Sequence, residues 1–283
     1  MRLQPIVLNI TLTTKYLKNE IQRNKKITLV FAFFYLPFSS MAWGVLGHRI
    51  IGQIADSYLT KHTKNAIAEI LGTESVAMAS NWPDFIKSDP SYNYLSNWHY
   101  INLKAGLSYD SVKAYLIADT ATDAYTKINF LVAELKNKNL QQERKVLYLR
   151  LLIHLVGDIH QPLHVGRLED QGGNKVKVLW FKDPSNLHTV WDTQLINFQQ
   201  LSYTEYTTAI NFTTKEQRRS LQQPPLSEWL YESYQLAEKI YGEIKEPDQK
   251  LDYAYNFKYV DTLNSQLLKG GVRLAGLLNE IFG

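Results

Sequence analysis

The sequence predicts a mainly α-helical, single-domain protein with at most a small β-hairpin. Apolar residues recur at spacings of three and four over most of the chain, and only one stretch alternates like a strand. No repeat, low-complexity tract or linker divides residues 43–283. The 283-residue chain is 45% hydrophobic and 20% charged, so it can bury a substantial core. This composition excludes a disordered or fibrous protein.

Residues 1–42 are predicted to be a signal peptide with a long n-region. Lys25 and Lys26 precede an apolar run over residues 27–38, and small residues follow up to Ala42. The run is shorter than the roughly 20 residues of a membrane-spanning helix. We therefore expect cleavage after Ala42, a secreted or periplasmic protein that begins at Trp43, and no stable membrane association. An uncleaved membrane anchor is the alternative.

Helical periodicity covers the greater part of the remaining chain. It is found over residues 47–59, 62–71, 109–136, 142–158, 226–242 and 251–282. Pro162 follows the fourth of these segments and should end that helix. The strand-like stretch is 175–181, which comes directly after the turn signal Gly172-Gly173-Asn174.

Charge and cysteine content narrow the possible chemistry. The formal charge is +4, from 31 Lys and Arg against 27 Asp and Glu, but residues 1–42 contain six of the basic residues and one of the acidic ones. The rest of the chain has 25 basic and 26 acidic residues, so overall basicity does not support nucleic-acid binding. Because the chain has no cysteine, any metal must be bound by nitrogen and oxygen ligands.

Histidine and aspartate residues recur in short motifs that suit metal binding. His154 and Asp158 are four residues apart on one predicted helix, so they should project from the same face. His188 and Asp192 repeat this spacing. The other candidates are His48 at the start of the first helix, Asp84 and His99 beside tryptophans, and His164 after Pro162.

Each motif alone has a plainer interpretation as a hydrogen-bonded core histidine or an ion pair. Together, five histidines and three aspartates match the ligands that zinc prefers. Eight side chains exceed the needs of one tetrahedral ion, so a cluster of two or three ions is predicted.

The arrangement resembles the S1/P1 nuclease family over nearly the whole of residues 43–283, which would form the catalytic domain. The matching motifs are Trp43 with Gly47-His48, Trp82-Pro83-Asp84, Trp98-His99-Tyr100, the run from His154 to His164, and the run from Asn186 to Asp192. The resemblance implies the phospholipase C/P1 nuclease fold and three Zn²⁺ per chain.

The resemblance also implies a ligand set for each zinc. Asp84, His99, His154 and Asp158 would hold the first. The amine and carbonyl of Trp43 would hold the second, with His48 and a bridging Asp158. His164, His188 and Asp192 would hold the third. His62 and His160 remain unassigned, and we expect a surface position for His62 and a packing or supporting role for His160.

The implied function is a zinc-dependent endonuclease, a monomer that hydrolyses single-stranded DNA and RNA to 5′-phosphorylated products and has 3′-nucleotidase activity. Lys87 would contact the phosphate, and Tyr100 would stack on a base, which favours single strands. A solvated lysine and a core tyrosine are the alternatives. Asn102 occupies the place of a family acid that orients or deprotonates the attacking water. An amide can orient water but cannot accept its proton, so the general base is left open.

Two other functions fit parts of the pattern. A zinc-dependent phospholipase C resembles this family in its fold, its N-terminal tryptophan and its three zincs, but we expect Glu at the last ligand position, where this chain has Asp192. A non-catalytic zinc-binding protein would need neither Lys87 nor Tyr100 beside its ligands.

Overall fold

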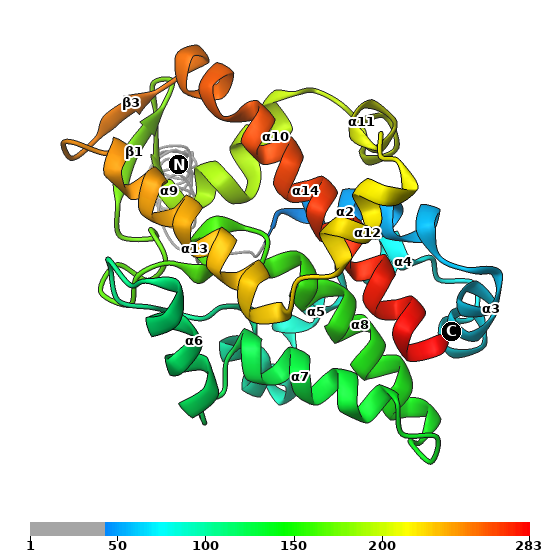
Figure 1. Cartoon of the computed structure of the whole chain (residues 1–283). Helices are drawn as coiled ribbons and strands as arrows, with labels where there is room; N and C mark the ends of the chain where they lie inside the picture. The colour runs from blue at the N-terminus through cyan, green and yellow to red at the C-terminus, as the bar shows by residue number, and fades with distance from the viewer. Residues whose placement is uncertain (1–42) are drawn as a thin grey trace, which may run out of the picture. The chain divides into compact units, whose positions relative to one another are not determined.

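The computed structural model describes residues 43–283, and the predicted signal peptide lies outside the described residues. The described chain is mainly helical, as predicted (Figure 1). In the order of the chain its α-helices are α2 (Val45–Tyr58), α3 (Lys61–Leu71), α4 (Val76–Ala79), α5 (Trp82–Phe85), α6 (Tyr109–Ala118), α7 (Ala124–Leu135), α8 (Gln142–Asp158), α9 (Leu187–Thr189), α10 (Leu195–Phe198), α11 (Tyr203–Ile210), α12 (Lys215–Gln222), α13 (Leu226–Glu243) and α14 (Tyr253–Phe282). Tighter or wider helical turns form η1 (Ile86–Ser88), η2 (Pro90–His99), η3 (Pro162–Val165) and η4 (Val190–Gln194).

Local side chains fix many of the helix starts. Thr60, Ser75 and Ser108 each accept a backbone N–H in the first turn of the helix that follows. The periodic segment 109–136 is two helices, α6 and α7, rather than one. The break arises because Asp123 caps α7 in a reciprocal capping box with Thr126.

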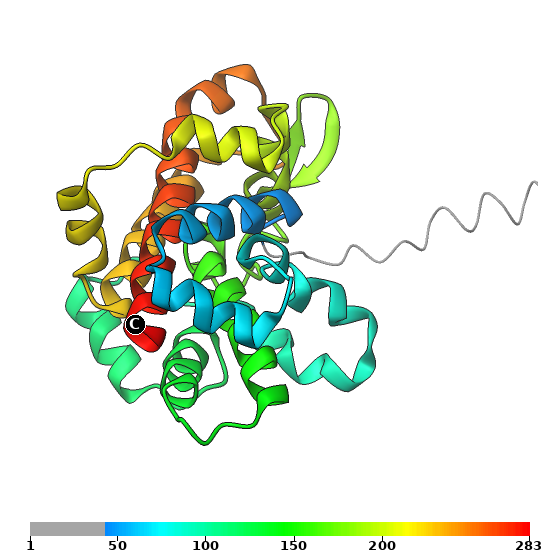
Figure 2. The ribbon, with the colours of Figure 1, turned by 90° about the vertical axis from the view of Figure 1, so that its right-hand side faces the viewer.

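The long helix α14 organises the core. It lies beside α2 in both views of the ribbon (Figure 1, Figure 2) and also contacts α8, α12 and α3. A Cβ at Gly271 would lie 2.5 Å from the side chain of Ile54, so only glycine permits this approach of α14 to α2.

A three-stranded sheet stands at one end of α14, with strands β1 (Lys177–Trp180), β2 (Asp183–Asn186) and β3 (Gln249–Leu251). The order is β2-β1-β3. β1 pairs antiparallel with β2, as the predicted hairpin requires, and parallel with β3. β3 was not predicted because three residues are too few to show a period. β2 leads directly into α9, so the hairpin sets the position of His188.

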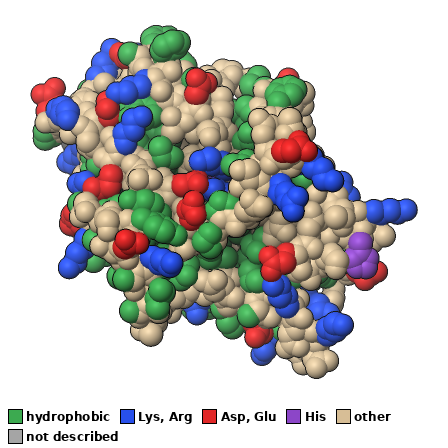
Figure 3. Space-filling model, viewed as in Figure 1, with side chains coloured by type: hydrophobic (Ala, Val, Ile, Leu, Met, Phe, Trp, Pro, Cys, Tyr) green, Lys and Arg blue, Asp and Glu red, His purple; other side chains and the backbone are tan. Residues whose placement is uncertain are grey.

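No helix within residues 43–283 is long and apolar enough to cross a membrane. On the face shown in Figure 3, Lys and Arg are scattered among Asp and Glu rather than gathered into one basic surface. This agrees with the near-neutral charge of the same residues.

Candidate metal centre

Eight predicted metal-ligating side chains meet in the interior of the described structure. They come from α2, α5, η2, α8, η3, α9 and η4, and all eight are buried: His48, Asp84, His99, His154, Asp158, His164, His188 and Asp192. Their ligand atoms form three sets, each with its atoms within 4.8 Å of one another: His48, Asp84 and His154; His99, His154 and Asp158; and His164, His188 and Asp192.

Asp158 lies at the centre of this cluster and turns its two oxygens to different histidines. Oδ2 is 3.0 Å from His99 Nδ1 and 3.2 Å from His154 Nε2. Oδ1 is 3.3 Å from His48 Nε2 and 3.5 Å from His164 Nδ1. A carboxylate that offers one oxygen to each of two groups of ligands has the geometry of a bridge between two ions.

Asp84 and His48 complete this half of the cluster. Asp84 Oδ1 is 3.8 Å from His154 Nε2 and 2.5 Å from Lys87 Nζ. The rings of His48 and His154 stack with their centroids 3.8 Å apart. The two sets that share His154 are therefore one continuous group of side chains.

The third set combines His164 of η3 with His188 of α9 and Asp192 of η4, which follow β2. His188 Nε2 is 2.9 Å from Asp192 Oδ2, and His164 Nε2 is 3.6 Å from Asp192 Oδ1. The amide of Gln161 donates a hydrogen bond to Asp192 Oδ1, and its oxygen accepts one from the backbone N–H of Leu163. Gln161 thus orients Asp192. Sequence reasoning missed it because it matches no ligand spacing.

Backbone carbonyls fix the ring tautomers of three histidines. Nδ1 of His154 lies 2.6 Å from the carbonyl oxygen of Ser80, Nδ1 of His164 lies 2.7 Å from that of His99, and Nδ1 of His188 lies 2.6 Å from that of Gly172. A carbonyl can only accept, so each Nδ1 must carry the hydrogen. In the neutral ring this leaves the Nε2 lone pair free to bind a metal.

The electrostatics of the cluster keep its carboxylates ionised. Burial would raise the pKa of Asp158, but His154 and His164 hold it well below its usual range. Burial would likewise raise the pKa of Asp192, but His188 and His164 lower it to about 2. For His99, burial lowers the pKa to about 4, which favours the neutral ring that a metal requires.

Unused lone pairs support a metal in this cluster. Among the described residues, the buried atoms Asp84 Oδ2, His99 Nε2 and His188 Nε2 make no hydrogen bond. Buried polar atoms without a partner are rare in native proteins. Bound cations would satisfy them, and a nitrogen and oxygen donor set without thiolates fits zinc.

Trp43 and Gly157 hold the first described residues against the cluster. The buried ring of Trp43 donates from Nε1 to the carbonyl of Gly157 at 2.8 Å, and the N–H of Gly44 donates to the carbonyl of Asp192 at 2.7 Å. A Cβ at Gly157 would lie 2.8 Å from Nδ1 of His48, so glycine lets α8 approach α2 at this point.

The predicted substrate-side residues lie at the edge of the cluster. Tyr100 is 37% exposed, so it is not a core tyrosine. Lys87 is paired with Asp84 rather than fully solvated. Asn102 is half-buried on an extended segment whose neighbours Ile101 and Leu103 donate to the carbonyls of His164 and Gly166 at 2.8 and 2.9 Å.

The two unassigned histidines, His62 and His160, belong to none of the three ligand sets. His62 is exposed on α3, as expected. His160 is buried, with Nδ1 2.7 Å from the carbonyl of Val156 and Nε2 3.1 Å from Nη1 of Arg273. It therefore supports the turn between Asp158 and His164.

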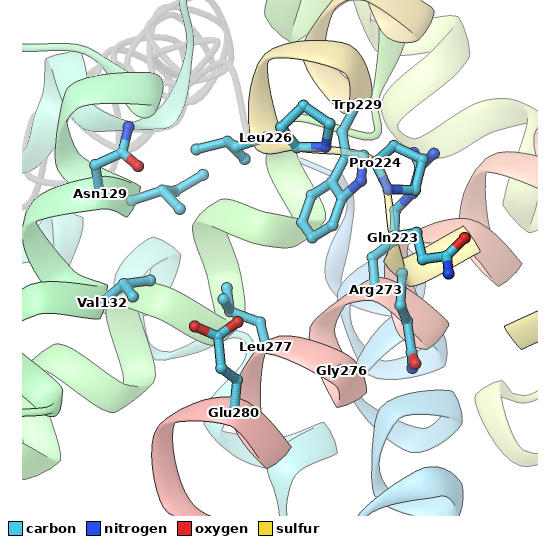
Figure 4. A pocket seen from close by; sticks show the side chains of 13 residues that line it. Asn129, Val132, Gln223, Pro224, Leu226, Trp229, Arg273, Gly276, Leu277 and Glu280 are labelled. Carbon is cyan, nitrogen blue, oxygen red and sulfur yellow. The ribbon is translucent and has the colours of Figure 1, made fainter. Parts of the chain in front are cut away.

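Arg273 also lines a recess of about 410 Å³ between α7, the α12–α13 turn and α14. Trp229 and Pro224 stand on one side of it, and Leu277 and Glu280 on another (Figure 4). None of the eight metal-ligating residues lines this recess, so it is separate from the metal centre.

Comparison with known proteins relates the chain to nucleases. Residues 43–283 match the family model described as S1/P1 Nuclease. The chain is 30% identical to Endonuclease 3 of Arabidopsis thaliana, over 90% of this chain and 94% of that protein. It is 31% identical to Nuclease S1 of Aspergillus oryzae over 54% of each, and 26% identical to Nuclease P1 of Penicillium citrinum over 85% of this chain and 98% of that protein.

Proposed function

The chain belongs to the S1/P1 nuclease family and is a hydrolase of phosphodiester bonds, and from this premise we propose that it is a zinc-dependent endonuclease of single-stranded DNA and RNA. Its products would carry 5′-phosphates, and 3′-nucleotides would also be substrates. The observation that supports the proposal most is the position of Asp158, whose two oxygens face different histidines at 3.0–3.5 Å.

We propose three zinc ions per chain, held as the resemblance implies. Asp84, His99, His154 and Asp158 would hold one, and His164, His188 and Asp192 another. The third would take His48, Asp158 and the amine and carbonyl of Trp43. Zinc bound there would lower the pKa of an adjacent water and neutralise charge on the phosphate during its hydrolysis.

The chain's own residues bind and orient the substrate. Lys87, 31% exposed and 2.5 Å from Asp84, can turn its ammonium to a phosphate oxygen when Asp84 binds metal. Tyr100 offers an exposed ring on which a base can stack. Single strands suit this contact because their bases can unstack from their neighbours. The amide of Asn102 would orient the attacking water without accepting its proton.

Export would complete the site. A free α-amine at Trp43 can bind a metal once deprotonated, whereas a peptide nitrogen has no available lone pair. Cleavage after Ala42 would therefore create a ligand, in the secreted or periplasmic protein. We expect this protein to be a monomer without stable membrane association.

The test measures hydrolysis of several substrates after the metal has been removed from the protein and then added back. Protein that begins at Trp43 would be stripped with a chelator, reloaded with Zn²⁺ or Mg²⁺, and assayed on denatured DNA, RNA, duplex DNA, 3′-AMP and lecithin. We expect three zincs per chain, and activity on single strands and 3′-AMP that only Zn²⁺ restores. Full activity without zinc, or phosphate ester release from lecithin alone, would overturn the proposal.

A further inference from the structure

A second exposed tyrosine, Tyr94, lies on η2, the helix that Tyr100 directly follows. Side chains three residues apart eclipse one another in a 3₁₀-helix, so Tyr94 and Asn97 lie on one face of η2, and Tyr100 follows the last residue of this helix in an extended conformation. All three are exposed, with Tyr94 53% and Tyr100 37% exposed. The hydroxyl of Tyr100 donates to Asn97 Oδ1 at 3.0 Å, which holds its ring next to that face of η2. We call Tyr94, Asn97 and Tyr100 the tyrosine row.

The ring of Tyr94 is held by other aromatic rings behind it. It packs edge-on against the buried Trp98 with centroids 5.9 Å apart, and lies 6.3 Å from the ring of Tyr92. Trp98 in turn packs edge-on against Phe130 of α7 at 6.5 Å. A ring supported in this way loses little freedom when a base stacks on its outer face.

Positive charge accompanies these rings. Nζ of Lys127, on α7, lies 4.9 Å from the ring centroid of Trp98 and 5.4 Å from that of Phe130. A second lysine, Lys87 on η1, lies next to the metal centre, with its Nζ 2.5 Å from Asp84 Oδ1. The acidic residue Asp89 is the exposed N-cap of η2, so it lies at the opposite end of this helix from His99. Cations interleaved with exposed aromatic rings are what single-stranded nucleic acid requires.

We propose that the tyrosine row is an extended binding site for single-stranded nucleic acid, in which Tyr94 stacks on a base several nucleotides from the one on Tyr100 and Lys127 attracts the intervening phosphates. This rests on the proposed function and deepens it. The row is continuous with the metal centre because His99, a metal-ligating residue, is the last residue of η2. In Figure 2 this segment is turquoise, at the right of the ribbon.

The spacing of the row sets a minimum length of substrate. At a rise of about 2.0 Å per residue, Tyr94 lies roughly 10 Å along η2 from His99, and Tyr100 comes after His99. Stacked bases advance by only about 3.4 Å per nucleotide. A mononucleotide can therefore occupy Tyr100 alone, and only an oligonucleotide of several residues can reach both rings.

A length series tests the proposal. The kcat/KM would be measured for 3′-AMP and for oligodeoxynucleotides of two, four, six and eight residues, with wild type, Tyr94→Ala, Tyr94→Phe and Tyr100→Ala. Tyr115→Ala is the matched control, because Tyr115 is 42% exposed on α6, outside the row. For Tyr94→Ala we expect the ratio of hexanucleotide to 3′-AMP kcat/KM to fall roughly 5- to 150-fold through KM, as the loss of one base stack predicts.

The other variants separate stacking from structure. Tyr94→Phe should keep the wild-type ratio, and Tyr100→Ala should lower kcat/KM at every length, including 3′-AMP. Lys127→Gln should reduce the salt dependence of log KM on long strands by about 0.7, the value for one phosphate contact with a single strand.

A ratio equal to that of wild type in Tyr94→Ala would overturn the proposal. So would an equal loss on 3′-AMP and on the hexanucleotide, because that result indicates a structural defect. If the wild type hydrolyses neither strands nor 3′-AMP, the proposed function itself fails. If the wild type is active and Tyr94→Ala keeps the wild-type ratio, the tyrosine row alone is refuted.

Discussion

The substitution Gly157→Ala tests the close approach of α8 to α2 at the metal centre. The added Cβ would lie 2.8 Å from Nδ1 and 3.2 Å from Cε1 of His48, which is too close for a stable contact. His48 is fully buried and its ring stacks on that of His154 at 3.8 Å, so it cannot move aside freely. The substitution should push His48 away from Asp158, whose Oδ1 is 3.3 Å away.

The size of the effect follows from two opposed contributions. Replacing glycine by alanine inside a helix stabilises by about 1 kcal/mol, whereas forcing extra volume into a packed interior costs about 1–3 kcal/mol. Gly242→Ala in α13 is the matched control, because a Cβ there meets nothing within 4 Å. Gly157→Ala should therefore be about 1–3 kcal/mol less stable than Gly242→Ala, or about 2–12 °C lower in Tm.

The assay combines thermal unfolding with zinc content and nuclease rate on the same preparations. Gly157→Ala should lose the zinc that His48 helps to hold, together with at least tenfold in rate, which is about 1.4 kcal/mol in the barrier. Gly242→Ala should keep both. Equal Tm, zinc content and rate in the two variants would refute the packing of His48 against Gly157.

Three other predictions address the bridge, the amine and the effect of pH. Asp158→Asn should abolish hydrolysis of RNA and single-stranded DNA, because the lost charge faces two groups of histidines. A residual rate above about a tenth of wild type, a loss of under about 1.4 kcal/mol, would contradict the bridge. One residue added ahead of Trp43 should leave the domain folded but remove one zinc and most activity, and equal zinc and rates in both forms would show that the amine is not a ligand. Burial, followed by a hydrogen bond with Asp119, raises the pKa of Asp123 to about 7. The folded protein therefore favours the protonated carboxyl of Asp123. The contribution of this carboxyl to the free energy of unfolding is complete below about pH 4 and is lost as pH rises through about 7. Asp119→Asn should thus lose less Tm between pH 5 and pH 8 than wild type does, and parallel curves would refute the coupling.

Much of the fold and part of the site could be predicted from local sequence. Apolar periodicity located α2, α3, α8, α13 and α14 to within two residues at each end. The spacing of four residues placed His154 and Asp158 on one face of α8, where their atoms are 3.2 Å apart. Such relations depend on the geometry of one helix, which the local chain determines by itself.

Other features depend on contacts between segments that are far apart in the chain. Asp84 and His99 reach Asp158 and His154 because α5 and η2 pack on α8, and no spacing in the sequence encodes that approach. Short motifs made Asp84 and His99 candidate ligands, but their assignment to one ion with Asp158 and His154 came only through resemblance to a family. The contact of Gln161 with Asp192 and the parallel pairing of β3 with β1 were not predicted at all.

The sequence alone therefore determined the helical class, the donor chemistry and the ligand pairs within a single helix. Only the tertiary structure decided which carbonyls orient the histidine rings, how Asp158 divides its oxygens, and that the ring of Trp98 packs against both Tyr94 and Lys127. The physical reason is that periodicity specifies the direction of a side chain relative to its own helix. Distances between helices depend on how residues such as Gly157 and Gly271 let their backbones approach.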